Sequence, residues 1–173
     1  MRRTAIPADA WKQWIAAALW LGLIAIESTD LLSSEHTGRF LYHWAVRLFG
    51  PVNPIRFEFW HHYLRKAGHF VGYAVLSSLL FRAWRATFPA GERPGWTFRW
   101  SWTFRWMSGA FITTVLVAGL DEWHQSMIPS RTGTLRDLAL DSTAAAVALL
   151  LIWLFSKNLR SQAISRARVT SSG

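Results

Sequence analysis

Four apolar runs separate the charged stretches of the chain, and each has ionisable residues at one end. The first begins at Trp14 and must continue to about Leu32 to supply the roughly 20 residues that a bilayer requires. The second and third, 67–81 and 107–120, are too short to cross alone and must extend into their charged flanks. The fourth is long enough but carries Asp141 inside it. The pattern predicts an all-α protein with four short transmembrane helices, at about 14–32, 65–84, 107–127 and 137–156.

The segments outside these helices have the composition of membrane-surface or mobile chain. Residues 39–49 alternate aromatic and aliphatic side chains with cations at helical spacing, which predicts an interfacial helix between the first two spans. Pro51 lies where that helix is expected to stop. The sequence Trp-Thr-Phe-Arg-Trp occurs at 96–100 and again at 102–106, a cationic aromatic pattern that also favours the membrane surface. The tail, 157–173, is rich in Ser and Arg and is expected to be mobile.

Composition supports one membrane domain, residues 1–173. The chain is 51% hydrophobic and has 12 Trp, 11 Phe and 3 Tyr, more rings than a soluble core of this size buries, whereas both headgroup layers of a membrane favour them. The net charge of +9 would suit nucleic-acid binding, but the charges flank the apolar runs, so no nucleic-acid partner is predicted. The absence of Cys excludes disulfides and thiolate metal sites.

The distribution of charge predicts the orientation in the membrane. With four spans, the N-terminus, the loop between the second and third helices and the C-terminal tail share one side. That side holds twelve of the nineteen Lys and Arg residues but only two of the ten acidic residues. Because segments rich in Lys and Arg stay in the cytoplasm, both termini are predicted to lie on the cytoplasmic side of the inner (cytoplasmic) membrane. The other eight acids then lie toward the extracytoplasmic face.

This orientation brings polar residues of three helices together at the extracytoplasmic face. Lys66, His69 and Tyr73 are spaced by three and four residues, so they share one side of the second helix. Glu122 and Gln125 are neighbours one turn apart on the third helix. These residues therefore predict a candidate site. The alternative for the second helix is a snorkelling lysine beside a hydrogen-bonded histidine.

The turn between the third and fourth helices adds a cation to this candidate site. Pro129 is expected to end the third helix, and Gly133 is expected to permit a positive φ. This turn places Arg131 over the site, where it or Lys66 can neutralise carboxylates close to the hydrocarbon.

Two aspartates of the fourth helix have different alternatives. Asp137 follows Thr134 by three residues and fits a capping box as well as it fits a ligand-binding role. Asp141 lies one turn further in, where a charged carboxylate costs a few kcal/mol unless it is paired, so we expect it to belong to a functional network. Glu27, at the end of the first helix, is interpreted as a simple interfacial acid. No motif fixes metal-ligand spacing, so neither a metal nor a cofactor is predicted.

At these residues the chain resembles the VanZ-like family of small membrane proteins, named for a member associated with resistance to the glycopeptide antibiotic teicoplanin. One block is Lys66-Ala-Gly-His-Phe-Val-Gly-Tyr73, similar to the family pattern Lys-x-x-His-Phe-x-x-Tyr. The second block runs from Asp121-Glu122 through Arg131 and Asp137 to Asp141. Ser130 replaces the usual Gly before the Arg, and residues 144–148 lack the Asn and Gly common in the family.

The resemblance implies a shared fold and polar site but not a defined activity. Our leading hypothesis is a non-enzymatic cell-envelope protein that binds an anionic lipid headgroup, cell-wall precursor or glycopeptide, with a link to antibiotic resistance. The charged residues suit this because Arg and Lys recognise phosphate and carboxylate groups. Apart from membrane lipid, no partner follows from the sequence. The predicted ligand-binding residues are Lys66, His69, Tyr73, Glu122, Gln125, Arg131, Asp137 and Asp141.

Two alternatives remain open. Ser130-Arg131, Asp137 and Asp141 match the spacing of a motif in type 2 phosphatidic acid phosphatases, with Gly68-His69 resembling their Gly-His pair. Asp137 stands where those enzymes have a nucleophilic His, so a lipid phosphatase would need another mechanism. Its catalytic residues would be His69, Arg131, Asp137 and Asp141. In the second alternative, the polar cluster only holds the four helices together through hydrogen bonds.

Overall fold

The computed structural model describes residues 9–29, 34–89, 96–128 and 133–171, and within these ranges the chain is entirely helical apart from short connections. This confirms the predicted all-α class. The helices are α1 (Ala10–Glu27), α2 (Ser34–Phe49), α3 (Pro54–Thr87), α4 (Trp96–Ser126) and α5 (Leu135–Ser171).

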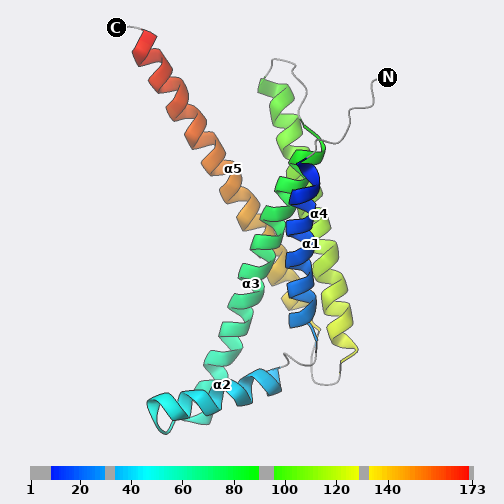
Figure 1. Cartoon of the computed structure of the whole chain (residues 1–173), viewed down its shortest axis with the longest axis vertical. Coiled ribbons are helices and arrows are strands. Elements are labelled where there is room, and N and C mark those ends of the chain that lie inside the picture. Colours follow the sequence, from blue (N-terminus) through cyan, green and yellow to red (C-terminus); the bar gives the residue numbers. More distant parts are fainter. Residues whose placement is uncertain (1–8, 30–33, 90–95, 129–132, 172–173) are drawn as a thin grey trace.

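Four of the helices lie along the long axis of the molecule, and α2 lies across them at one end (Figure 1). The chain direction alternates in the order α1, α3, α4, α5 (Figure 1). α3 is the central element because it packs against each of the other four helices, while α4 also packs against α5. α5 crosses α3, and its C-terminal half then projects away from the other helices (Figure 1).

α3 begins much earlier than the predicted second span, at Pro54 rather than near Arg65. The side chain of Asn53 accepts hydrogen bonds from the backbone N–H groups of Ile55 (3.0 Å) and Arg56 (3.3 Å), which caps the helix. Proline at the first helical position lacks the N–H that a helix start leaves unpaired, and its fixed φ suits a helix. Residues 54–64, which precede the predicted second span, are therefore the first part of α3.

α1 ends at Glu27, so the expected continuation of helix to about Leu32 is wrong. The backbone N–H of Thr29 bonds to the carbonyl of Ile26, a tighter turn than an α-helix makes, and its hydroxyl donates to the same carbonyl at 2.7 Å. Side-chain bonds of this kind compete with helix continuation. Residues 30–33 lie outside the described part of the chain.

The other helices also extend beyond the predicted spans. α4 begins at Trp96, so the repeated Trp-Thr-Phe-Arg-Trp segment is helical and continuous with the third span. α5 continues through Ser171 and includes most of the tail. Mobility of the tail stays a prediction, because a long helix that leaves the bundle can still bend.

Side-chain contacts hold α2 against the start of α3. Gly50 follows α2 with a φ of +82°, which glycine adopts without a steric penalty and which turns the chain back. The Tyr42 hydroxyl then donates to the carbonyl of Val52 at 3.0 Å, and the Tyr42 ring meets Phe57 edge-on at 5.2 Å. His61 is buried and stacks on Phe57 at 5.8 Å.

Small side chains of α4 and α5 lie where the long helices meet. α4 and α5 each contribute alanines with no exposed surface, which lets helix backbones approach closely. These residues are Ala110, Ala118, Ala144 and Ala145. Two hydroxyls are also fully buried there: Ser77 donates to the carbonyl of Ala145 (3.4 Å), and Thr114 donates within its own helix (2.8 Å).

Many large apolar side chains face outward. Leu116 is 63% exposed and Phe155 is 65% exposed. Within the described ranges, two segments are long and apolar enough to cross a membrane, Trp102–Ser126 of α4 and Leu135–Lys157 of α5. In their most apolar stretches of 18 residues, only 17% and 22% is buried, whereas the core helix of a soluble protein is mostly buried. This exposure favours a membrane protein.

We expect Gly109→Ala to lower the stability of the bundle. An added Cβ would lie 2.9 Å from Cδ2 of Trp84, whose ring is packed between Trp14 (6.1 Å, edge-on) and Phe88 (5.5 Å, stacked) and cannot move away freely. Overpacking costs about 1–3 kcal/mol, more than the gain of up to about 1 kcal/mol in helix propensity. Thermal unfolding in detergent measures the effect. The control is Gly119→Ala, where the Cβ meets nothing within 4 Å and the melting temperature should stay equal or rise. Equal shifts for both variants would contradict the prediction.

Candidate functional site

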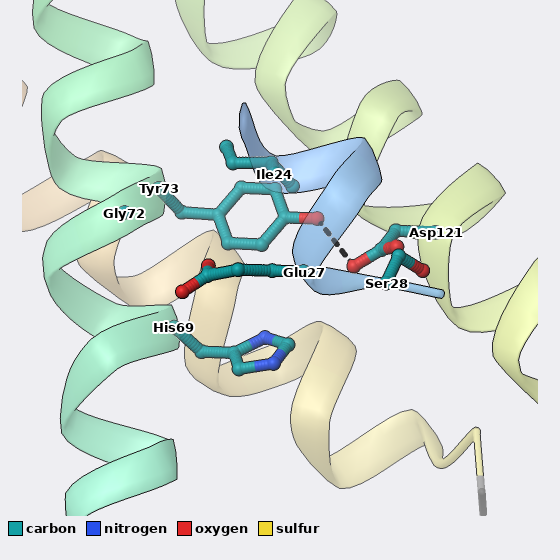
Figure 2. Close-up of a pocket in the computed structure, with 7 residues that line it drawn as sticks. All are labelled: Ile24, Glu27, Ser28, His69, Gly72, Tyr73 and Asp121. Atoms are coloured by element: carbon teal, nitrogen blue, oxygen red, sulfur yellow. Dashed lines mark hydrogen bonds between the residues drawn. The ribbon is translucent and has the colours of Figure 1, made fainter. Parts of the chain in front are cut away.

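The candidate site lies where α1 and α4 end and α5 begins, against the middle of α3 (Figures 1 and 2). Three side chains on one face of α3, as their spacing predicts, each reach a carboxylate on α4 or α5. Because the three carboxylates come from two different helices, this row of residues joins α3 to both. The pairs are Lys66 with Asp137, His69 with Asp141, and Tyr73 with Asp121.

Asp121 is satisfied by two hydrogen bonds. Its Oδ2 accepts a hydrogen bond from the Tyr73 hydroxyl at 2.9 Å (Figure 2) and a second from Nε2 of Gln125 at 3.0 Å. The second bond joins two residues that lie one turn apart on α4. All three residues are buried. Two donors on one oxygen stabilise a carboxylate away from water.

The start of α5 is capped by residues of both α4 and α5. The backbone N–H of Asp137 donates to Oγ1 of Thr134 at 3.2 Å, as in a capping box. In a standard box the Asp137 carboxylate would accept the N–H of Thr134, but here that N–H donates to Oε2 of Glu122 at 2.7 Å. The Asp137 carboxylate accepts instead from the Thr134 hydroxyl (2.8 Å) and from Lys66. The predicted cap is therefore present, with Glu122 taking one of its bonds.

Gly133 is required by close approach and not by a positive φ, so the prediction of a left-handed glycine here is wrong. An added Cβ would overlap the backbone oxygen of Glu122 and lie 3.0 Å from the amide nitrogen of Ser126. α4 ends at Ser126, before Pro129, and the Ser126 hydroxyl donates to the carbonyl of Trp123 at 2.6 Å. Gly133 therefore packs directly on the end of α4.

The predicted cation over the site, Arg131, lies outside the described residues. Lys66 is committed to Asp137. Within the described ranges, no Lys or Arg forms an ion pair with the other three carboxylates of the site. Those three are Asp121, Glu122 and Asp141.

Asp141 is the least satisfied group in the site. It has no exposed surface, and neither carboxylate oxygen has a hydrogen-bond partner among the described residues. Its Oδ2 lies 3.7 Å from Nδ1 of His69, close enough for attraction but too far for a hydrogen bond. One ligand atom each from His69, Glu122 and Asp141 lies within 4.8 Å of the other two, so these residues could hold a metal ion. Their separation along the chain explains why no metal motif was visible.

A small pocket opens beside His69 and Tyr73. The Glu27 side chain, interpreted from the sequence as an interfacial acid, extends from α1 between those two residues (Figure 2). Ser28 is also buried at this wall, with its Oγ 3.4 Å from Nδ1 of His124. The alternating direction of the helices was the available signal, since it brings the end of the first helix to this face. The lining residues are Ile24, Glu27, Ser28, His69, Gly72, Tyr73 and Asp121.

We expect Tyr73→Phe to destabilise the protein by about 1–3 kcal/mol, because it leaves a buried carboxylate with one donor fewer. The shape of the side chain is otherwise unchanged. The midpoint of thermal unfolding in detergent measures the loss. Tyr63→Phe is the matched control, since Tyr63 lies on the same helix with 53% of its surface exposed. A Tyr73→Phe variant as stable as wild type would show that the bond to Asp121 contributes little.

Comparison with known proteins identifies the family. Residues 13–156 match the family model described as VanZ/LLP1, which is most of the chain and includes every predicted site residue. No curated protein and no solved structure matches the chain significantly. The match confirms the resemblance seen in the two sequence blocks. The chain belongs to the VanZ/LLP1 family.

Proposed function

We propose that the chain crosses the cytoplasmic membrane four times, through α1, α3, α4 and α5, with both termini in the cytoplasm. The alternating direction of these helices supports this topology (Figure 1). So do the outward-facing apolar residues on the two less apolar helices, such as Leu19 on α1 (72% exposed) and Val71 on α3 (58% exposed). The excess of Lys and Arg on the side of the termini sets the orientation. The candidate site then faces the extracytoplasmic side.

Single cysteines test this topology, because the chain contains no Cys of its own. Leu135→Cys, at an 84% exposed position beside the site, should react with a membrane-impermeant maleimide in intact cells. Pro89→Cys, an exposed position at the other end of the bundle, should react only after the membrane is permeabilised. Reversed labelling would contradict the orientation, and labelling of both positions in intact cells would contradict four spans.

The function that we propose for the site is binding of an anionic envelope molecule: a lipid headgroup, a cell-wall precursor or a glycopeptide. The observation that carries it is the placement of Lys66, which Asp137 holds at the rim of the site with 37% of its side chain exposed. Arg131 lies two residues before Gly133 in the sequence, and Gly133 packs on the end of α4. A lysine and an arginine at one site suit phosphate or carboxylate groups. A role in glycopeptide resistance would follow from binding at this face.

The phosphatase-like alternative has less support. Asp141 has no exposed surface, and a nucleophile or general base must touch its substrate. Asp137, in the position of the phosphatase nucleophile, is engaged by Lys66 and by the helix cap.

We expect one class of anionic ligand to raise the melting temperature of the purified protein, because a ligand that binds only the folded state stabilises it, by about 2.7 kcal/mol at 100 times its Kd. The panel contains polyprenyl phosphates, anionic phospholipids and teicoplanin. Arg131→Ala should abolish the shift. Arg136→Ala should keep it, because Arg136 is an exposed arginine outside the proposed site. An equal shift in wild type and Arg131→Ala would show that the ligand binds without Arg131 and would contradict the proposed site. No shift with any class would leave the purely structural alternative.

A further inference from the structure

We propose that His69, Glu122 and Asp141 bind one divalent transition-metal ion, Zn²⁺ or Mn²⁺, at the meeting point of α3, α4 and α5. One ligand atom from each residue lies within 4.8 Å of the other two. His69 precedes Glu122 by 53 positions and Asp141 by 72, and the three residues come from three separate helices. This site goes beyond the proposed anionic ligand and does not depend on it.

The state of Asp141 is the strongest reason to place a cation here. Asp141 is fully buried, both of its oxygens lack a hydrogen-bond partner among the described residues, and Oδ2 points toward Nδ1 of His69 at 3.7 Å. Buried polar groups are nearly always paired, so an unpaired carboxylate calls for a missing partner. The neighbouring carboxylates differ, because Asp121 and Asp137 each accept two bonds. A metal ion supplies the positively charged partner that Asp141 lacks among the described residues.

The other two ligands are held in position by contacts outside the metal site. The backbone N–H of Thr134 donates to one oxygen of Glu122, which fixes the carboxylate and directs it toward the start of α5. The His69 ring stacks on Tyr73, with ring centres 6.3 Å apart. Tyr73 is itself tied to Asp121. Such outer contacts orient metal ligands and raise affinity.

The ligand atoms and their spacing select the ion. Zinc bonds to imidazole nitrogen and carboxylate oxygen are about 2.0–2.2 Å long, which places two ligands of a tetrahedral ion about 3.3 Å apart. The 3.7 Å between His69 and Asp141 therefore needs only a small movement, and the ligand atom of Glu122, within 4.8 Å of both, must also move closer. An imidazole favours Zn²⁺ over Mg²⁺ and Ca²⁺, while carboxylates also suit Mn²⁺. Thiolate ligands are excluded because the chain has no Cys.

Three protein ligands leave a coordination position open, as in metal sites that bind a water or a ligand. The small pocket lined by His69, Tyr73 and Glu27 reaches one of the three ligands, His69 (Figure 2). A bound metal would also offset the three carboxylates that have no Lys or Arg partner in the described part of the chain and would otherwise repel an anionic ligand.

The experiment uses the full chain in detergent, stripped with a chelator and then loaded with Zn²⁺ or Mn²⁺ alone. We expect one ion per chain by elemental analysis after desalting, and a higher melting temperature than in the chelated protein. Asp141→Asn, His69→Gln and Glu122→Gln should each weaken the affinity measured by calorimetry by at least about 10- to 100-fold, the range for losing even an outer partner of a ligand. Glu58→Gln and His62→Gln, exposed positions on α3, are the matched controls and should bind as wild type does.

Two results would overturn the site: wild-type protein that retains neither ion and gains no stability, or undiminished binding in Asp141→Asn and His69→Gln. If the variants fail to fold, pulsed EPR of Mn²⁺-loaded wild type decides instead. Coupling of the ion to a histidine nitrogen is expected, and a spectrum of hydrated Mn²⁺ alone would exclude the site. No anionic ligand is present, so this outcome is independent of the proposed ligand binding.

Discussion

The need to match buried carboxylates with donors or cations governs the architecture of this chain. Four acids of α4 and α5 lie where the helices converge. Three of them are buried, and Asp137 is partly exposed. α3 bonds to two of them, Asp137 and Asp121, through Lys66 and Tyr73, and places His69 beside a third, Asp141. Because an unmatched carboxylate is costly in a buried or lipid environment, these contacts constrain the rotation of α3.

Close backbone packing makes that pairing geometrically possible. The alanines of α4 and α5 let the helices approach closely, so a donor such as the Tyr73 hydroxyl reaches across the helix interface. At the turn before α5, Gly133 does the same for the backbone, which lets a single N–H group reach Glu122. Close helix packing and the hydrogen bonds to the carboxylates therefore depend on the same few small residues.

Much of this could be read from the sequence. The spacing of Lys66, His69 and Tyr73 predicted one face of a helix, and Thr134 with Asp137 predicted the cap, because both depend on local helical geometry. Helix lengths were predicted less well. An apolar run ends at the first charged residues, whereas a helix ends where a cap or a competing side-chain bond terminates it, as at Asn53 and Thr29.

The triad of His69, Glu122 and Asp141 could not be predicted from spacing, because its members meet only through the packing of three helices. Glu27 was set aside for the same reason, since only the packing of α1 on α3 brings it to the pocket. For Gly133 the residue type was informative but its cause was not. A turn glycine can serve a backbone angle or a close contact, and the sequence does not distinguish them.

The unbroken length of α3 has a mechanical consequence. Its 34 residues form a rod of about 50 Å at 1.5 Å per residue, longer than the roughly 30 Å of bilayer hydrocarbon. One end carries α2 with its exposed Phe40 and Leu48, and the middle carries the three residues that hold the carboxylates. A rigid rod has no hinge to absorb movement, so any tilt imposed on α2 by its surroundings also shifts the donors against their acids. α3 therefore couples the position of α2 to the geometry of the polar site.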